Sequence, residues 1–121
     1  MKRDFSIIRK ILINVEDAQP GQVIQNFTYH DSDPRTIAEH VRLLIEAGFL
    51  QGEIVGQLGS SEDHYFVSRM TWDGHEFLAN AKNDTIWKKV IADAEEKGTS
   101  ISLSVLNSLL SAAAKKYVGI E

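Results

Sequence analysis

The sequence predicts an α+β protein in which helices outnumber strands. Three observations lead to this fold class. Apolar residues recur at helical spacing in several segments, two β-rich runs flank a turn-forming stretch, and the last third is helical in pattern. Of the 121 residues, 43% are hydrophobic and 25% charged, which is typical of a globular protein with its own core. We expect a single domain over 1–121, with a core over 1–82 and a helical C-terminal extension over 83–121.

The first predicted helix covers residues 4–17, because Asp4 is a favourable N-cap and apolar residues follow it at helical spacing. Pro20 cannot continue a helix and Gly21 permits a turn, so the helix ends before them. Residues 23–29 are rich in β-forming residues, although they alternate imperfectly. They predict a short strand.

A second helix is predicted over 34–47, with an acidic residue before Pro34 and a stop at Gly48. Two strands follow, over 50–58 and 65–70, separated by a polar turn. Their proximity in the chain predicts a β-hairpin.

Three more helices are predicted in the rest of the chain. Thr71 can cap a short one, Asn83 opens the next, and either Ser100 or Ser102 begins the last. The C-terminal part is therefore expected to be wholly helical.

This order of elements resembles that of winged helix-turn-helix proteins. The segment 41–50 resembles the end of a recognition helix and its passage into the wing, and 65–78 resembles the second wing strand and the following helix. In that pattern Thr71 caps the helix and Gly74 allows close packing. One departure is that the helix usually placed before the recognition helix is missing, very short, or fused to the start of the helix 34–47.

Over nearly its full length the chain also resembles the domain-of-unknown-function family 2513, a small bacterial and phage family. The residues that carry this resemblance are Met1–Asp4 with Ile8–Leu12, Ile37–Val41, Leu43–Gly48, Thr71–Leu78 and Asp84–Trp87. The resemblance implies a fold and a phage or mobile-element setting. It implies no activity and no catalytic residues.

A winged-helix fold points to double-stranded DNA as the partner and to transcription regulation as the role. The polar face of the helix 34–47 would read base edges, and other cations would contact the phosphate backbone. The predicted base-reading residues are Arg35, Thr36, Glu39, His40 and Arg42, and the predicted backbone contacts are Lys2, Arg3, Arg9, Lys10 and Arg69.

Charge limits this hypothesis. The formal charge of −4 excludes a basic body that coats nucleic acid indiscriminately. The arginines of the helix 34–47 are spaced to pair with its glutamates, so a neutralised solvated face is an equal alternative. The acidic residues Glu62 and Asp63 at the wing tip also disfavour phosphate contacts there.

The last helix has a predicted apolar face that favours homodimerisation, and the alternative is that this face completes a monomer core. The predicted interface residues are Val105, Leu106, Leu109, Leu110, Ala113 and Tyr117. Trp72 and Trp87 are predicted to be core or interface anchors. The alternative function is a protein-interaction adaptor that keeps the winged-helix scaffold and binds a host or phage partner without DNA.

The sequence favours no enzymatic chemistry. There is no cysteine, and the four histidines are scattered without the spacing of metal ligands, so we expect neither a metal site nor another cofactor. No apolar stretch has the length of a signal core or a membrane span. The expected location is the cytoplasm, with no membrane partner.

Overall fold

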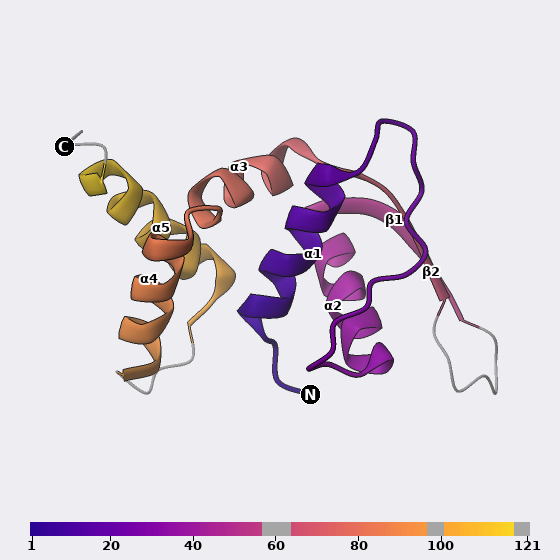
Figure 1. The fold of residues 1–121 in the computed structure, drawn as a ribbon, viewed down its shortest axis with the longest axis horizontal. Helices are drawn as coiled ribbons and strands as arrows, with labels where there is room; N and C mark the ends of the chain where they lie inside the picture. The colour runs from indigo at the N-terminus through magenta and orange to yellow at the C-terminus, as the bar shows by residue number, and fades with distance from the viewer. Residues whose placement is uncertain (57–63, 97–100, 118–121) are drawn as a thin grey trace. The chain divides into compact units, whose positions relative to one another are not determined.

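The computed structural model describes residues 1–56, 64–96 and 101–117. Within these ranges the protein has an α+β fold, as predicted, with five helices and two strands (Figure 1). In chain order they are α1 (Phe5–Asp17), α2 (Pro34–Glu46), β1 (Leu50–Val55), β2 (His64–Met70), α3 (Trp72–Ala81), α4 (Asp84–Glu96) and α5 (Leu103–Tyr117). The chain divides within α3 into two compact units, unit 1 (Met1–His75) and unit 2 (Glu76–Glu121).

The first two helices begin at the predicted caps. The Asp4 carboxylate accepts a hydrogen bond from the backbone N–H of Ser6 at 2.8 Å. The Asp33 carboxylate accepts from both the backbone N–H and the hydroxyl of Thr36, each at 2.9 Å, and Pro34 occupies the first turn. These bonds satisfy N–H groups that have no partner within the helix, which is why α1 and α2 begin where they do.

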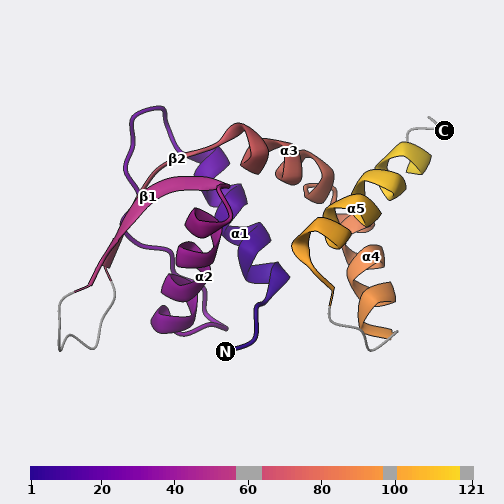
Figure 2. The ribbon, with the colours of Figure 1, turned by 180° about the vertical axis from the view of Figure 1, so that it is seen from behind.

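Both helices bury one apolar face in the core of unit 1. α1 packs on α2 and β2, and α2 packs on β1. The two helices lie side by side with their N-terminal ends at the same end of the unit, as both views show (Figures 1 and 2). The fully buried apolar side chains here include Ile8, Ile11, Leu12, Ile37, Val41, Leu44 and Leu50. Each such side chain contributes about 1.5–3 kcal/mol by leaving water.

The predicted β-hairpin is confirmed. β1 and β2 are antiparallel, with Leu50 opposite Met70 and Val55 opposite His64. The predicted turn and the wing-tip acids Glu62 and Asp63 lie outside the described residues.

The corner between α2 and β1 depends on Gly48, which has a φ of +80° that favours glycine. The Thr71 hydroxyl donates to the Gly48 carbonyl at 2.6 Å and accepts from the Gly74 N–H at 3.1 Å. A Cβ on Gly74 would lie 2.4 Å from the Phe49 carbonyl oxygen. The predicted roles of threonine as cap and glycine as close-packing residue are therefore confirmed.

The predicted strand over 23–29 is wrong. Ile24 forms only an isolated bridge to Val67, with two backbone hydrogen bonds of 2.9 Å. The chain then leaves the sheet because Phe27 turns into the core. Its ring stacks on Tyr65 with centroids 5.9 Å apart, and its N–H donates to the Tyr65 hydroxyl at 2.8 Å. Burial of this aromatic side chain outweighs further strand pairing.

The segment between α1 and α2 is described throughout and contains no helix. Of the three arrangements open at the sequence level, the structure therefore has the one in which the helix before α2 is missing.

Unit 2 is helical, as predicted. Asn83 accepts from the Ile86 N–H at 3.0 Å, and Ser102 accepts from the Val105 N–H at 3.1 Å. Ser102, rather than Ser100, thus caps α5; Ser100 lies outside the described residues. α4 and α5 pack on one another, and Trp87 is buried in this unit.

The two tryptophans differ in environment. Trp87 is buried, as a core anchor should be, whereas Trp72 is 75% exposed at the start of α3. The prediction of a core role for Trp72 is wrong. Residues two positions apart on a helix lie on nearly opposite sides, and Gly74 is the one that lies against Phe49.

Candidate nucleic-acid interface

The exposed side of α2 carries most of the predicted base-reading residues. Arg35 is exposed at the first turn, and Glu39 and Arg42 follow one and two turns later, each about two-fifths exposed. Arg42 Nε lies 3.6 Å from Glu39 Oε2. The predicted pairing within the helix is therefore present for this arginine. Such an exposed pair contributes at most about 1 kcal/mol, so Arg42 can leave it for a stronger acceptor.

Thr36 is less available for a hydrogen bond to a DNA base than the sequence predicts. It is half-buried, and its hydroxyl donates to the Asp33 carboxylate that caps α2. The same bonds, from the Thr36 N–H first and then from its hydroxyl, lower the pKa of Asp33 below 3.8. Asp33 is thus charged at neutral pH and competes with any acceptor on DNA for this hydroxyl.

The prediction that His40 lies on the outward face is wrong. Its side chain is fully buried, at 0% exposure. Nε2 accepts a hydrogen bond from the Asp4 backbone N–H at 2.8 Å, and Nδ1 lies 2.7 Å from the Thr36 carbonyl oxygen. Because a backbone N–H can only donate, Nε2 is the acceptor and Nδ1 donates to Thr36. His40 ties the start of α1 to the middle of α2 and cannot read bases.

This bond has a consequence for the predicted backbone contacts. By fixing Asp4 at α2, it holds the N-terminal segment, which contains Lys2 and Arg3, at the end of unit 1 where both helices begin (Figure 1). Both residues are exposed, and the Arg3 guanidinium lies over the Phe5 ring at 4.8 Å. The structure thus brings two predicted phosphate contacts to the end of the unit that also holds Arg35.

The remaining predicted backbone contacts are dispersed. Lys10 lies 3.5 Å from the Asp31 carboxylate and 5.6 Å from the centroid of the Tyr29 ring, so it is already engaged. Arg9 is half-buried on α1. Arg69 is exposed on β2, opposite Gln51. The hairpin therefore adds one exposed cation among its described residues rather than a basic cluster.

Unit 1 is acidic as a whole. Its sequence contains seven Lys and Arg residues and eleven Asp and Glu residues, so it accounts for the formal charge of −4 of the chain. Two of these acids, Asp31 and Asp33, lie just before α2. The pKa of Asp31 is lowered by a backbone hydrogen bond and by Lys10, so this carboxylate is also charged at neutral pH. A basic surface on unit 1 can therefore cover only a small part of it, where exposed Lys and Arg side chains lie away from these acids.

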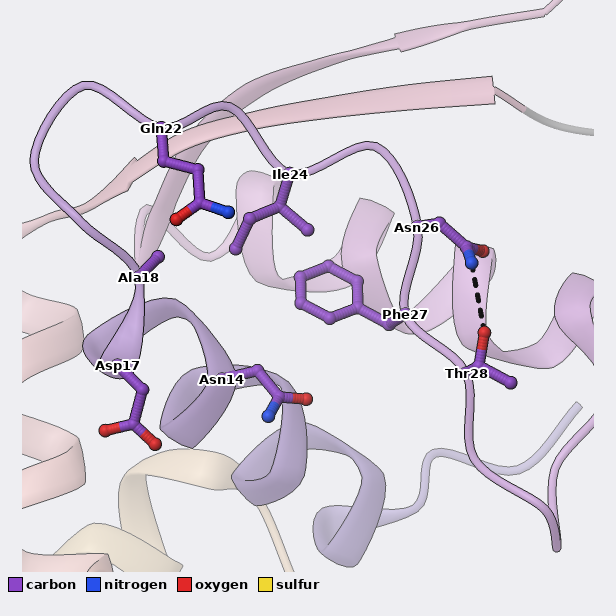
Figure 3. A pocket seen from close by; sticks show the side chains of 8 residues that line it. All are labelled: Asn14, Asp17, Ala18, Gln22, Ile24, Asn26, Phe27 and Thr28. Carbon is purple, nitrogen blue, oxygen red and sulfur yellow. Dashed lines mark hydrogen bonds between the residues drawn. The ribbon is translucent and has the colours of Figure 1, made fainter.

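A shallow polar hollow in unit 1 was not predicted. It lies between the C-terminal half of α1 and the segment 22–28, and Figure 3 shows the side chains that line it. Asn14 and Asp17 come from α1, and Gln22 and Asn26 from the segment; the Asn26 amide donates to the Thr28 hydroxyl at 3.0 Å. None of the predicted DNA contacts lines it. Its polar side chains lie close together because of the conformation of the segment 22–28. This segment is a loop, so no periodic sequence pattern could predict the hollow.

The predicted dimer interface on α5 divides into two sets. Leu106 and Leu110 are fully buried within unit 2, so they belong to its core and are not available to a partner. Val105, Leu109 and Tyr117 are 47%, 44% and 67% exposed. Ala113 is half-buried. The helical face was predicted as one surface, whereas the structure uses half of it for packing on α4.

Neither a metal centre nor a membrane span is found in the part of the chain that the structure describes. Within residues 1–56, 64–96 and 101–117, no three His, Asp or Glu side chains gather so that they could hold a metal ion. No helix in the same ranges is long and apolar enough to cross a membrane.

Comparison with known proteins assigns the chain to a family. The family described as Hypothetical protein (DUF2513) matches residues 2–100, which include unit 1 and α4. The chain belongs to the DUF2513 family. A Haemophilus influenzae protein described as uncharacterized is 30% identical to this DUF2513 protein over 112 residues, which cover 90% of this chain and 92% of that one. No solved structure matches the chain significantly. The predicted family resemblance is confirmed.

Proposed function

We propose that this protein binds double-stranded DNA as a transcription regulator, with α2 entering the major groove. The observation that carries the proposal is the placement of α2. One face is buried against α1 and β1, and the opposite face presents Arg35, Glu39 and Arg42 to solvent. An α-helix fits the width of the major groove, and arginine is the side chain best suited to guanine. DNA lies in the cytoplasm of a bacterium, which is the location that we propose, and a phage or mobile-element setting remains part of the proposal.

The topology of unit 1 supports this docking mode. α1, α2 and the β1–β2 hairpin follow one another in the winged-helix order, and the Ile24–Val67 bridge adds a minimal third strand to the hairpin. The unit lacks the helix that usually precedes the recognition helix. Residues before α2 must then provide the phosphate contacts that this helix would make.

The exposed cations set the expected strength of binding. Lys2, Arg3, Arg35 and Arg69 are exposed, and an exposed cation can exchange the partner it has for a phosphate. Lys10 is half-buried and lies 3.5 Å from the Asp31 carboxylate. Since the logarithm of the binding constant falls by about 0.9 per phosphate contact for each logarithmic unit of salt, four contacts give a slope of about −4. We expect weak binding to random DNA and selectivity that depends on the α2 contacts.

The experiment is a selection of duplexes from random oligonucleotides, followed by titration of the selected duplex with variants. Arg35→Glu combined with Arg42→Glu should abolish binding. A matched control is Lys88→Glu combined with Lys115→Glu, which makes the same change of net charge at exposed positions in unit 2. The control should bind like the wild type. If the α2 variant kept its affinity, the groove model would be refuted.

A second candidate function is a protein-interaction adaptor. It is favoured by the acidic balance of unit 1 and by Trp72, whose exposed fraction of 75% is large for a residue that often anchors protein interfaces. Mobility-shift measurements at low and moderate salt discriminate between the two functions. The absence of any retarded complex at both salt concentrations would favour the adaptor.

A further inference from the structure

The structure leaves three of the five predicted base-reading residues of α2 available to a ligand. His40 is fully buried, with both ring nitrogens hydrogen-bonded inside unit 1. The Thr36 hydroxyl donates to the carboxylate that caps the helix. The three that reach solvent are Arg35, Glu39 and Arg42. Of the predicted set, α2 therefore offers a ligand two guanidinium groups and one carboxylate.

These three side chains lie along one line of α2. Their spacing of four and then three residues places them on the same side of the helix. At about 1.5 Å per residue, Arg42 lies about 4.5 Å beyond Glu39 and about 10 Å beyond Arg35. Base pairs follow one another at about 3.4 Å, so these distances correspond to about one and about three base-pair steps. Glu46 continues the line in the last turn, beyond the N-terminal part of a recognition helix that contacts bases.

The ion pair between Glu39 and Arg42 orients both side chains and leaves each a group for a ligand. Arg42 Nε lies 3.6 Å from Glu39 Oε2, and each side chain is about two-fifths exposed. The contact is made by Nε, so it does not use the two terminal nitrogens of the guanidinium group. The carboxylate likewise keeps its second oxygen as an acceptor. The pair thus presents donors and an acceptor side by side.

The major-groove edges of two bases match these groups. Guanine presents two acceptors, O6 and N7, to which a guanidinium group can donate two parallel bonds, and cytosine presents an N4 amino group from which a carboxylate can accept. Adenine is best matched by an amide side chain, and α2 contains neither asparagine nor glutamine. The thymine methyl group requires an apolar contact, which this line of charged side chains does not offer.

We propose that the duplex recognised by α2 has adjacent guanine and cytosine bases at its centre, with Arg42 donating to the guanine and Glu39 accepting from the cytosine. Arg35 then donates to a second guanine about two base-pair steps from the cytosine. This inference rests on the proposed function, because it names the class of DNA sequence that the same helix selects.

Selection from a pool of duplexes with a randomised centre tests the role of Glu39. The wild-type protein should enrich a site with adjacent guanine and cytosine. Glu39→Gln should change the preferred base at one position from cytosine to adenine, by about 5- to 150-fold in relative affinity, because an amide both donates and accepts. Glu95→Gln is the matched control, since it removes the same charge at an exposed position of α4. It should enrich the wild-type site.

Arg42→Ala separates a base contact from a phosphate contact. It should relax the preference for guanine at one position next to the cytosine and leave the other positions unchanged. A uniform loss of affinity over all sequences would overturn the inference, because it would show that Arg42 contacts a phosphate. Far-UV circular dichroism confirms that each variant is folded.

The selection also distinguishes failure of this inference from failure of the proposed function. A wild-type site composed of adenine and thymine, or an unchanged preference in Glu39→Gln, would overturn the inference while DNA binding stands. If the wild-type protein enriched no duplex at all, the proposed function would be refuted, and the inference with it.

Discussion

Replacement of His40 by alanine should destabilise unit 1 strongly. The side chain is fully buried, and the replacement removes its packing together with the bonds to the Asp4 N–H and the Thr36 carbonyl. Truncation of a large buried side chain costs about 2–5 kcal/mol, and each lost hydrogen bond about 1 kcal/mol. We expect a loss of about 3–5 kcal/mol in the free energy of unfolding, a large part of the roughly 5–15 kcal/mol that holds a domain together.

Urea unfolding followed by circular dichroism measures this loss, and a second variant separates its causes. His40→Leu restores most of the volume but leaves the Asp4 N–H without its acceptor, so it should still cost about 1–3 kcal/mol. The control is Arg42→Ala, which removes only an exposed ion pair and should change stability by less than about 1 kcal/mol. If His40→Leu were as stable as the wild type, the hydrogen bond between α2 and the start of α1 would contribute nothing and our account of His40 would be refuted.

Three further predictions concern stability. Gly74→Ala should cost about 1–3 kcal/mol in thermal unfolding, because its Cβ would lie 2.4 Å from the Phe49 carbonyl oxygen; an unchanged melting temperature would contradict this contact. Asp33→Ala should lower the melting temperature at neutral pH. Because hydrogen bonds from Thr36 lower the pKa of Asp33 in the folded state, its stabilisation is present above 3.8 and lost as the pH falls through the lowered pKa, so wild type and variant should converge in acid. Leu106→Ala, at a fully buried position of α5, should cost about 2–5 kcal/mol, and a loss below about 1 kcal/mol would contradict its place in the core.

The helices could be predicted because their signals are local. Asp4, Asp33, Asn83 and Ser102 each cap a helix through bonds to N–H groups two or three residues later. Such bonds depend on residue type and spacing alone. The hairpin and its corner could be predicted for the same reason, since a positive φ at Gly48 is a local requirement.

Features that depend on contacts between residues far apart in the sequence could not be predicted from local patterns. Residues 23–29 have β propensity, but the stacking of Phe27 on Tyr65, 38 residues away, draws the chain off the sheet. At His40 the sequence pattern was the better guide, and the residue type was misleading. With Ile37, Val41 and Leu44 it completes the i, i+3, i+4, i+7 pattern of a buried face, so the spacing indicated burial while the residue type suggested solvent.

The candidate site shows the same limit. Periodicity grouped Leu106 and Leu110 with Val105 and Leu109, because it reports which residues share a helix face and not which neighbour covers them. The position of α4 divides that face. Likewise, the spacing of Glu39 and Arg42 predicted their ion pair, whereas the bond that fixes Asp4 against α2 joins residues 36 positions apart and has no local signal.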